Sequence, residues 1–137
     1  MRGEYTVDAK GRLNFPAKLR NTFGDHFYIA KSIYDKCLIV YNEKSWAEFQ
    51  DKLRDKPQEI AMPILRYVVG NACEAEPDKQ GRIAIAQHLR DFAGITSDIT
   101  IVSMGDKAEI WDTELLRENE DEFGQAAIMK LAKKAEI

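Results

Sequence analysis

The chain has 137 residues, enough for one domain with its own core or for two small units that share one. Hydrophobic residues make up 45% of it and charged residues 31%, a balance that excludes the disordered and membrane-spanning classes. No apolar run approaches eighteen residues and no signal-peptide pattern is found, so we expect a cytoplasmic protein. The net charge of -3 disfavours a nucleic-acid partner on average, but basic and acidic residues are segregated along the chain, which permits a positive face.

A β-hairpin is the first element that the sequence predicts. Apolar residues alternate with polar neighbours on both sides of Asp8-Ala9-Lys10-Gly11, at positions Tyr5, Val7, Leu13 and Phe15. This alternation is typical of strands. The Asp8 carboxylate can accept hydrogen bonds from backbone N–H groups of the turn, and Gly11 can adopt a positive φ without steric cost. We therefore expect these two residues to structure the turn.

A short helix and two strands are predicted after the hairpin. Pro16 suits the first position of a helix, and Gly24 suits the cap at its carboxyl end. The next apolar runs predict strands over 27–31 and 37–41. The unit is thus strand, strand, short helix, strand, strand.

Two amphipathic helices are predicted in the middle of the chain. Ser45-Trp46-Ala47-Glu48 has the form of a capping box, which predicts that a helix begins there. Lys56-Pro57 interrupts this helix, and Pro63 is expected to begin a second one that ends at Gly70-Asn71.

The hairpin and its short helix occur twice. A shift of 70 residues, without a gap, superimposes Asp8 on Asp78, Gly11 on Gly81, Arg12 on Arg82, Leu19 on Leu89, Arg20 on Arg90 and Gly24 on Gly94. Such a match indicates a duplicated supersecondary unit. The second half should therefore contain strands over 72–76, 99–102 and 108–111 around a second hairpin. A last helix, capped by Asp112 or Thr113, is expected to continue through Phe123 towards Leu131.

Basic residues beside both turns are the candidate functional residues. Turn chemistry accounts for Asp and Gly in each copy, but not for the Arg that follows both times or for the neighbouring lysines. Cationic side chains on a tight turn can enter a DNA groove, where Arg matches guanine O6 and N7 and Lys contacts phosphate. The alternative is a well-made hairpin with solvated arginines. The candidates for DNA contact are Lys10, Arg12, Lys79 and Arg82, and those for turn structure are Asp8, Gly11, Asp78 and Gly81.

Enzymatic sites are not indicated. His26 and His88 lack metal-ligand spacing, and Cys37 and Cys73 are isolated, which favours structural histidines and buried thiols. Carboxylates over 118–122 form a run that is typical of a solvated helix face. A hydrolase that uses this run is a minor alternative. We expect no cofactor, no metal and no small-molecule substrate.

The duplicated motif resembles known transcription factors. Asp-x-x-Gly-Arg, followed by an apolar-x-apolar-Pro segment and then Leu-Arg, is similar to the half-unit of AbrB-type swapped-hairpin proteins. Gly3-Glu4-Tyr5 precedes the first motif, Cys73-Glu74-Ala75-Glu76 precedes the second, and Glu109-Ile110-Trp111 follows late in the chain. With these segments the sequence resembles the MraZ family over nearly its whole length, except at the carboxyl-terminal end.

The resemblance implies a bacterial regulator of the division and cell-wall gene cluster that binds double-stranded DNA in the nucleoid. The target would be short G-rich direct repeats upstream of its own operon. The implied fold is α+β, with two tandem swapped-hairpin units (AbrB/SpoVT type) interleaved into one small barrel-like core, flanked by helices. Subunits of the family assemble into a ring-shaped homo-oligomer. The resemblance places Arg12 and Arg82 on the DNA-binding face, and the AbrB half-unit adds Arg20 and Arg90 as weaker candidates.

The expected organisation is a first unit with its helix over 1–55, a connecting helix over 56–70, a second unit with its helix over 71–125 and a tail over 126–137. Two departures from the family pattern stand out. Tyr5 and Asp8 are close together, so the first strand is expected to be shortened or shifted in register. Ala86 replaces the proline that corresponds to Pro16, so the second short helix should start less sharply. We therefore expect the two turns to differ.

An alternative function remains open at this point. Swapped-hairpin units also occur in antitoxins, and the carboxyl-terminal region of this chain is acidic. A protein-binding module of antitoxin type is therefore the alternative hypothesis. A doubled unit and helix formers in the tail favour the DNA-binding regulator.

Overall fold

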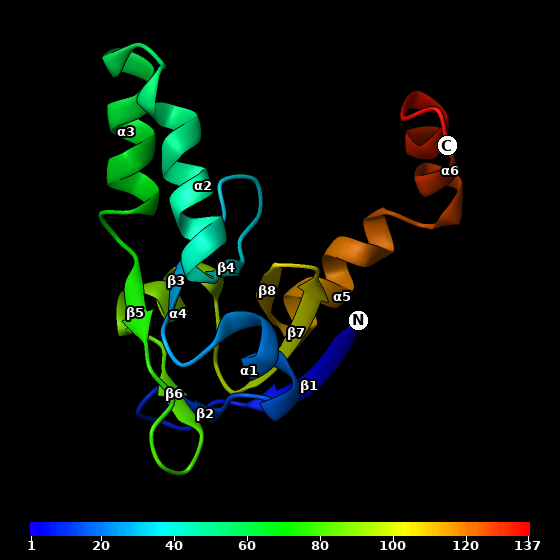
Figure 1. Cartoon of the computed structure of the whole chain (residues 1–137). Helices are drawn as coiled ribbons and strands as arrows, with labels where there is room; N and C mark the ends of the chain where they lie inside the picture. The colour runs from blue at the N-terminus through cyan, green and yellow to red at the C-terminus, as the bar shows by residue number, and fades with distance from the viewer.

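The computed structural model describes all 137 residues and contains eight strands and six helices (Figure 1). This confirms the α+β class. The elements are β1 (Arg2–Thr6), β2 (Arg12–Asn14), α1 (Ala17–Phe23), β3 (Phe27–Lys31), β4 (Leu38–Tyr41), α2 (Glu43–Arg54), α3 (Gln58–Val68), β5 (Cys73–Ala75), β6 (Arg82–Ala84), α4 (Gln87–Ala93), β7 (Asp98–Met104), β8 (Lys107–Asp112), α5 (Thr113–Glu122) and α6 (Gln125–Lys134).

Six strands form one antiparallel sheet in the order β1-β7-β8-β4-β3-β5, and β2 and β6 form a separate two-stranded ribbon. The predicted local hairpins are therefore wrong in their pairing. β1 and β2 flank the first turn, but β1 pairs with β7 and β2 pairs with β6. The cross-copy ribbon places Leu13 opposite Ile83, and both side chains are buried, so this pairing gives each three-residue strand an apolar partner.

The two copies are related by an internal two-fold pseudosymmetry. Leu13 pairs with its own counterpart Ile83 in the ribbon, and Ile39 pairs with its counterpart Glu109 between β4 and β8. One detail of the sequence match is wrong. Tyr5 pairs with Ile99, whereas its counterpart Ala75 pairs with Phe27, so β7 corresponds to β3 with an offset of 72 rather than 70. Two extra residues before β7 are compensated by the shorter β7–β8 turn.

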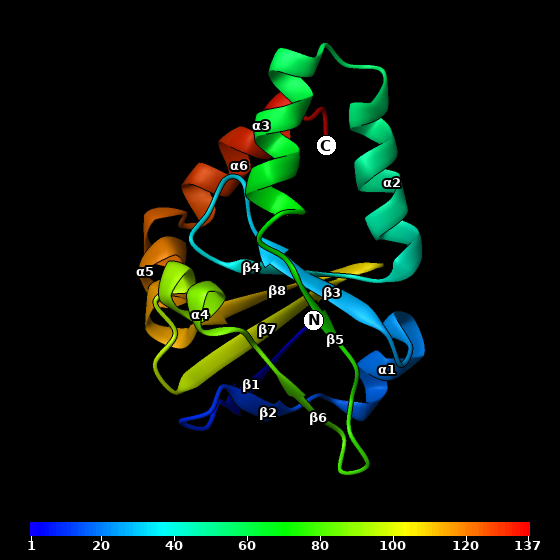
Figure 2. The same ribbon diagram turned by 90° about the vertical axis from the view of Figure 1, so that its left-hand side faces the viewer.

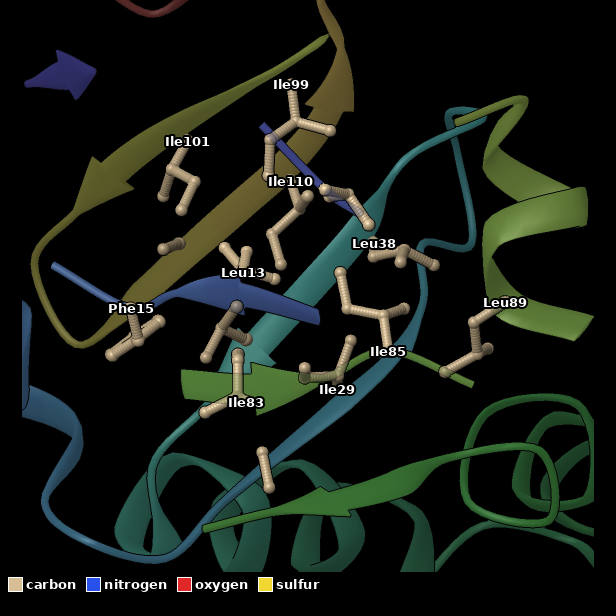
Figure 3. Packing of buried hydrophobic residues seen from close by; sticks show 14 of the residues in the cluster. Leu13, Phe15, Ile29, Leu38, Ile83, Ile85, Leu89, Ile99, Ile101 and Ile110 are labelled. Carbon is tan, nitrogen blue, oxygen red and sulfur yellow. The ribbon is translucent and has the colours of Figure 1, made fainter. Parts of the chain in front are cut away.

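The main core lies between the large sheet and the ribbon. Figure 3 shows Leu13, Phe15, Ile83 and Ile85 of the ribbon segments directed towards Ile29, Leu38 and Ile110 of the sheet. Both copies contribute to this cluster of 19 buried residues, so neither half has a core of its own. Burial of this shared apolar surface is what fixes the position of the ribbon and of the two turns that it carries.

The opposite face of the sheet is covered by helices. Trp46 of α2 stacks on Tyr28 and packs with Tyr41, and Trp111 forms a smaller cluster with Leu116 of α5. Both tryptophans are thus core residues, as their apolar settings indicate. The α2–α3 pair and α6 project on the side away from the ribbon (Figures 1 and 2). No helix is long and apolar enough to cross a membrane.

Helix ends differ from the predictions where a nearer cap is available. Asn42, not Ser45, caps α2, because its side chain accepts a hydrogen bond of 2.7 Å from the Ser45 N–H. Pro57 takes the N-cap position of α3, so Pro63 lies inside that helix rather than at its start. The last helix does not run on to Leu131: it ends at Glu122, and α6 begins only after Phe123-Gly124.

The two departures from the family pattern have no effect on the elements that they were expected to alter. β1 has five residues and β5 three, so the first strand is not shortened. Ala86 has φ -57° and ψ 145°, close to the -57° and 127° of Pro16, and both short helices have seven residues. Pro16 and Ala86 are the N-cap residues of these helices, one position before the first helical position that the sequence predicts for Pro16.

Candidate nucleic-acid interface

The first turn is held together by the Asp8 side chain. Asp8 Oδ1 accepts hydrogen bonds of 2.9 Å from the N–H groups of Lys10 and Arg12, and Asp8 Oδ2 accepts a third, also of 2.9 Å, from Arg12 Nε. The backbone closes the turn between Asp8 and Arg12, and Gly11 takes a φ of +81°. One carboxylate therefore shapes the loop and also fixes the direction of the arginine.

The second turn repeats these contacts atom for atom. Asp78 Oδ1 accepts 2.9 Å bonds from the N–H groups of Gln80 and Arg82, and Arg82 Nε donates to Asp78 Oδ2 at 3.1 Å. Gly81 has a φ of +79°. Because two segments 70 residues apart reach the same geometry, the Asp-x-x-x-Arg sequence itself determines it.

These hydrogen bonds lower the pKa of both aspartates. The backbone N–H of Arg12 is the largest cause for Asp8, and that of Arg82 is the largest cause for Asp78. Both carboxylates are therefore ionised at neutral pH and hold the positively charged guanidinium groups. A carboxylate that is already paired in this way repels a phosphate less than a free one would.

Arg12 and Arg82 lie on the same outer face of the ribbon. Strand alternation buries Leu13 and Ile83 and turns their neighbours outward, and Arg12 is opposite Ala84 while Arg82 is opposite Asn14. The two arginines are thus offset by two residues, about 7 Å along the ribbon. Only Nε of each guanidinium bonds to protein, so both terminal NH₂ groups are free to donate. Figures 1 and 2 show this ribbon and its turns at the end of the molecule opposite to α2, α3 and α6.

The ribbon joins the two turns directly. The Phe15 N–H donates to the Gly81 carbonyl at 3.0 Å, and the Ile85 N–H donates to the Gly11 carbonyl at 2.8 Å. Each glycine is thus bonded to the strand of the other copy. Lys10 and Lys79 are exposed beside the turns, where no salt bridge holds them.

The two turns differ in what lies behind their glycines. Arg90 Nε donates to the Ile85 carbonyl at 3.0 Å, and a Cβ on Gly11 would come within 2.7 Å of both of these atoms. Nothing lies within 4 Å of the corresponding position on Gly81. Arg20, the counterpart of Arg90, bonds instead to Asp25 at 2.8 Å. The turns are therefore unequal, as expected, but because of the residues behind them and not because of Tyr5 or Ala86.

Two features of this surface could not be found from motifs alone. Asn14 is exposed on the outer face of the ribbon opposite Arg82, whereas its counterpart is Ala84. Arg90 occupies the back of the first turn. Alternation in the Arg12–Asn14 strand could have indicated the position of Asn14, but no local signal distinguishes Arg90 from Arg20.

Other reactive groups do not form a catalytic or metal site. No group of three or more His, Cys, Asp or Glu residues is arranged to hold a metal ion. Burial raises the pKa of the Cys37 thiol to about 12, so it is no nucleophile at neutral pH. His26 bonds to Glu43 and Glu74 at 2.9 and 3.0 Å, which raises its pKa. The 118–122 carboxylates project from one exposed helix and do not oppose one another.

Comparison with known proteins gives a consistent family. The family described as "MraZ protein, putative antitoxin-like" matches residues 3–61 and 68–136. A protein of Caldicellulosiruptor saccharolyticus is 40% identical over 139 residues, covering 98% of this chain and 95% of its own. A protein of Carboxydothermus hydrogenoformans is 38% identical over 136 residues, covering 96% and 94%. Both are named "Transcriptional regulator MraZ".

The family and these names class the chain with transcriptional regulators rather than enzymes. The chain belongs to the MraZ family.

Proposed function

We propose that the chain regulates transcription by binding double-stranded DNA through the ribbon and its two Asp-x-x-x-Arg turns. One observation carries the proposal: two arginines, each fixed by its own aspartate, project from the outer face of one antiparallel ribbon. A two-stranded ribbon fits into the major groove of B-DNA, where the edges of the bases can be distinguished. In this proposal, Arg12 and Arg82 give each chain two side chains that read the groove.

The aspartates prepare the arginines for this role. Each Nε–H is used by Asp8 or Asp78, which orients the guanidinium plane and leaves its terminal NH₂ groups free to donate. Two parallel donors match guanine O6 and N7, and each such pair contributes roughly 1–3 kcal/mol of discrimination. Because the side chains are already held in place, little rotamer entropy is lost on binding. This supports a G-rich target.

The other basic residues have supporting roles in the proposal. Lys10 and Lys79 contact phosphates next to the ribbon and supply affinity that is blind to sequence. Arg20 is bonded to Asp25 through one terminal nitrogen, and its remaining N–H groups contact phosphate. Arg90 acts behind the first turn as a positioning residue, because its Nε is bonded to the Ile85 carbonyl. Asn14 adds an amide that can read adenine beside Arg82, and the other half of the ribbon has Ala84 at this position.

The biological target follows from family membership. We propose that the DNA is a set of short G-rich direct repeats upstream of the chain's own operon, within the bacterial division and cell-wall gene cluster. The protein acts in the cytoplasm on the nucleoid, as a ring-shaped homo-oligomer. Several subunits on successive repeats would gain affinity through a high effective concentration.

The organisation proposed for the chain follows the same family. The units over 1–55 and 71–125 are two swapped-hairpin halves of AbrB/SpoVT type, 56–70 connects them and 126–137 is a tail. Support comes from the exchange of strands, since β1 and β2 pair with β7 and β6 of the other copy. In this proposal the ribbon and the large sheet, which lie on either side of the shared core, form one small barrel-like unit.

The proposal is tested by fluorescence anisotropy with a duplex carrying the upstream repeats and with a shuffled duplex of the same composition. Arg12→Ala and Arg82→Ala should each weaken repeat binding by about fivefold to a hundredfold, with an unchanged melting temperature. Arg54→Ala is the matched control, because Arg54 is an exposed arginine on α2 that contacts only Asp51. If both turn variants bind the repeats as tightly as the control does, the ribbon is not the reading surface.

A protein-binding role of antitoxin type is the second candidate. The family description contains the words "putative antitoxin-like", which adds to the acidic carboxyl-terminal region as support for this role. A small basic protein that purifies in a fixed ratio with the chain, and that is released by acidic-to-basic changes in α5 rather than by changes in the turns, would support it.

A further inference from the structure

The last helix of the chain has no partner. None of the ten residues of α6 is buried, and its large apolar side chains are about half exposed: Ile128 by 51%, Met129 by 53% and Leu131 by 48%. Figure 1 shows α6 beyond the end of α5, apart from the α2–α3 pair. A ten-residue helix is too short to be stable in water by itself. Its apolar stripe therefore has to pack against something outside its own element.

The chemistry of α6 defines what it can pack against. Ala127, Ile128 and Leu131 lie on one side of the helix, by their three- and four-residue spacing. Lys134 borders this stripe, Lys130 lies farther round on the same flank and Lys133 lies on the opposite side, so α6 is basic around an apolar stripe and contains no acidic residue. A suitable receptor surface must therefore be an apolar groove with carboxylates along its rim.

Such a groove lies between the β3–β4 loop and α5. It has a volume of about 260 Å³, and the side chains of Tyr34, Trp111 and Leu115 give it an apolar floor. The Tyr34 side chain is 92% exposed. Aromatic side chains are more often at least partly buried, so this ring is available for contact with another surface. The floor therefore offers apolar contacts to the stripe of α6.

The rim of the groove is acidic. Asp35, Glu118 and Glu122 line it, with Lys36 as the single basic residue. α5 as a whole carries five carboxylates and one arginine. The rim is thus opposite in charge to α6, which carries three lysines and no acidic residue, and this favours their pairing and disfavours docking of α6 on another basic face.

We propose that α6 of one chain docks into the groove between the β3–β4 loop and α5 of a second copy. This contact joins two different surfaces, so each chain can use its groove and its helix at the same time, and the contact repeats until a ring closes. The proposal rests on the self-association proposed above, but it does not depend on the DNA contacts, because ribbon and groove are separate surfaces.

The test uses charge reversal on the full chain, followed by light scattering after gel filtration. One variant carries Lys130→Glu, Lys133→Glu and Lys134→Glu; the other carries Glu118→Lys and Glu122→Lys. Each variant alone should associate at least about tenfold more weakly than the wild type. Asp121→Lys is the matched control, because Asp121 is on α5 but lines a different pocket, next to Arg2 and Glu120, and it should assemble normally. All the changed residues are exposed, so circular dichroism should report an unchanged fold.

Mixing the two variants gives the decisive result. The intact helix of the groove variant should bind the intact groove of the helix variant, and the reversed helix should bind the reversed groove, so the equimolar mixture should assemble again to about the wild-type mass with the two variants alternating. A chain that carries both sets of changes should regain the wild-type mass. The proposal is overturned if the wild-type chain is a monomer, if both variants keep the wild-type mass, or if mixing yields only monomers, as it would if α6 folded back on its own α5. The affinity of each variant for a duplex with a single repeat is measured in parallel by fluorescence anisotropy. Because the ribbon is unchanged in these variants, a failure of this proposal can be distinguished from a failure of the DNA proposal.

Discussion

The clearest test of the inequality of the two turns is to replace each glycine with alanine. Gly11 and Gly81 have nearly the same φ, +81° and +79°, so a side chain at either position is strained to the same extent. Only their surroundings differ. A Cβ on Gly11 would lie 2.7 Å from Arg90 Nε and from the Ile85 carbonyl oxygen, while a Cβ on Gly81 would meet nothing within 4 Å.

The magnitudes follow from these contacts. The left-handed conformation costs an alanine about 1 kcal/mol at either site. Gly11→Ala adds a steric cost of roughly 1–3 kcal/mol, because the Ile85 carbonyl is fixed: its own N–H donates to the Gly11 carbonyl at 2.8 Å. We therefore expect Gly81→Ala to lower the free energy of unfolding by about 1 kcal/mol and Gly11→Ala by about 2–4 kcal/mol.

Urea unfolding monitored by tryptophan fluorescence, at one fixed protomer concentration, would measure both values. The double variant Gly11→Ala with Arg90→Ala should recover part of the loss, because one of the two close contacts is removed. Equal destabilisation by the two glycine substitutions would refute the idea that Arg90 and Ile85 pack against the first turn alone.

Two further predictions concern titratable groups. Hydrogen bonds to Glu43 and Glu74 raise the pKa of His26, so the protonated imidazole stabilises the fold below its ordinary pKa of about 6.5, and this contribution is lost as the pH rises through the raised value. His26→Gln should therefore flatten the dependence of the unfolding midpoint on pH on the alkaline side of about 6.5, and a slope identical to that of the wild type would speak against the cluster. Burial raises the pKa of Cys37 to about 12, so iodoacetamide at neutral pH should modify this thiol only after unfolding, and rapid labelling of the native chain, located by mass spectrometry, would contradict its burial.

Local features of the fold could be read from the sequence because they depend on short-range chemistry. The alternation around Ile29 predicts β3 over 27–31, which is the range that the structure has. Asp8 and Gly11 indicate a turn, and the turn is there with the expected positive φ. Such features need only a few neighbouring residues to be specified.

Pairing between distant segments could not be read in the same way. Leu13 would fit opposite Tyr5 or Val7 in a local hairpin as well as opposite Ile83, and the choice is made by the core that both copies share. The two-residue insertion before β7 is also hidden, since Val40 and Ile110 still match at an offset of 70. Strand register depends on the complete sheet, which no single segment contains.

The candidate site likewise combines local features, which the sequence predicts, with long-range features, which it does not. Asp8 and Asp78 were recognisable from their repeated spacing to Arg12 and Arg82, because the contacts span only four residues. That both arginines share one face of one ribbon follows only from the pairing of β2 with β6. Arg90 behind Gly11 depends on the packing of α4 on the other copy's turn, so sequence alone could not separate it from Arg20.

The central claim is that the forked guanidinium groups of Arg12 and Arg82 read the DNA. The most direct test is the double variant Arg12→Lys with Arg82→Lys, which keeps both charges but removes the fork. Binding to the promoter repeats and to shuffled DNA is measured by anisotropy over a range of salt concentrations. Loss of the preference for the repeats, with affinity for shuffled DNA and its salt dependence unchanged, is the predicted result. A variant that still prefers the repeats as strongly as the wild type would contradict the claim.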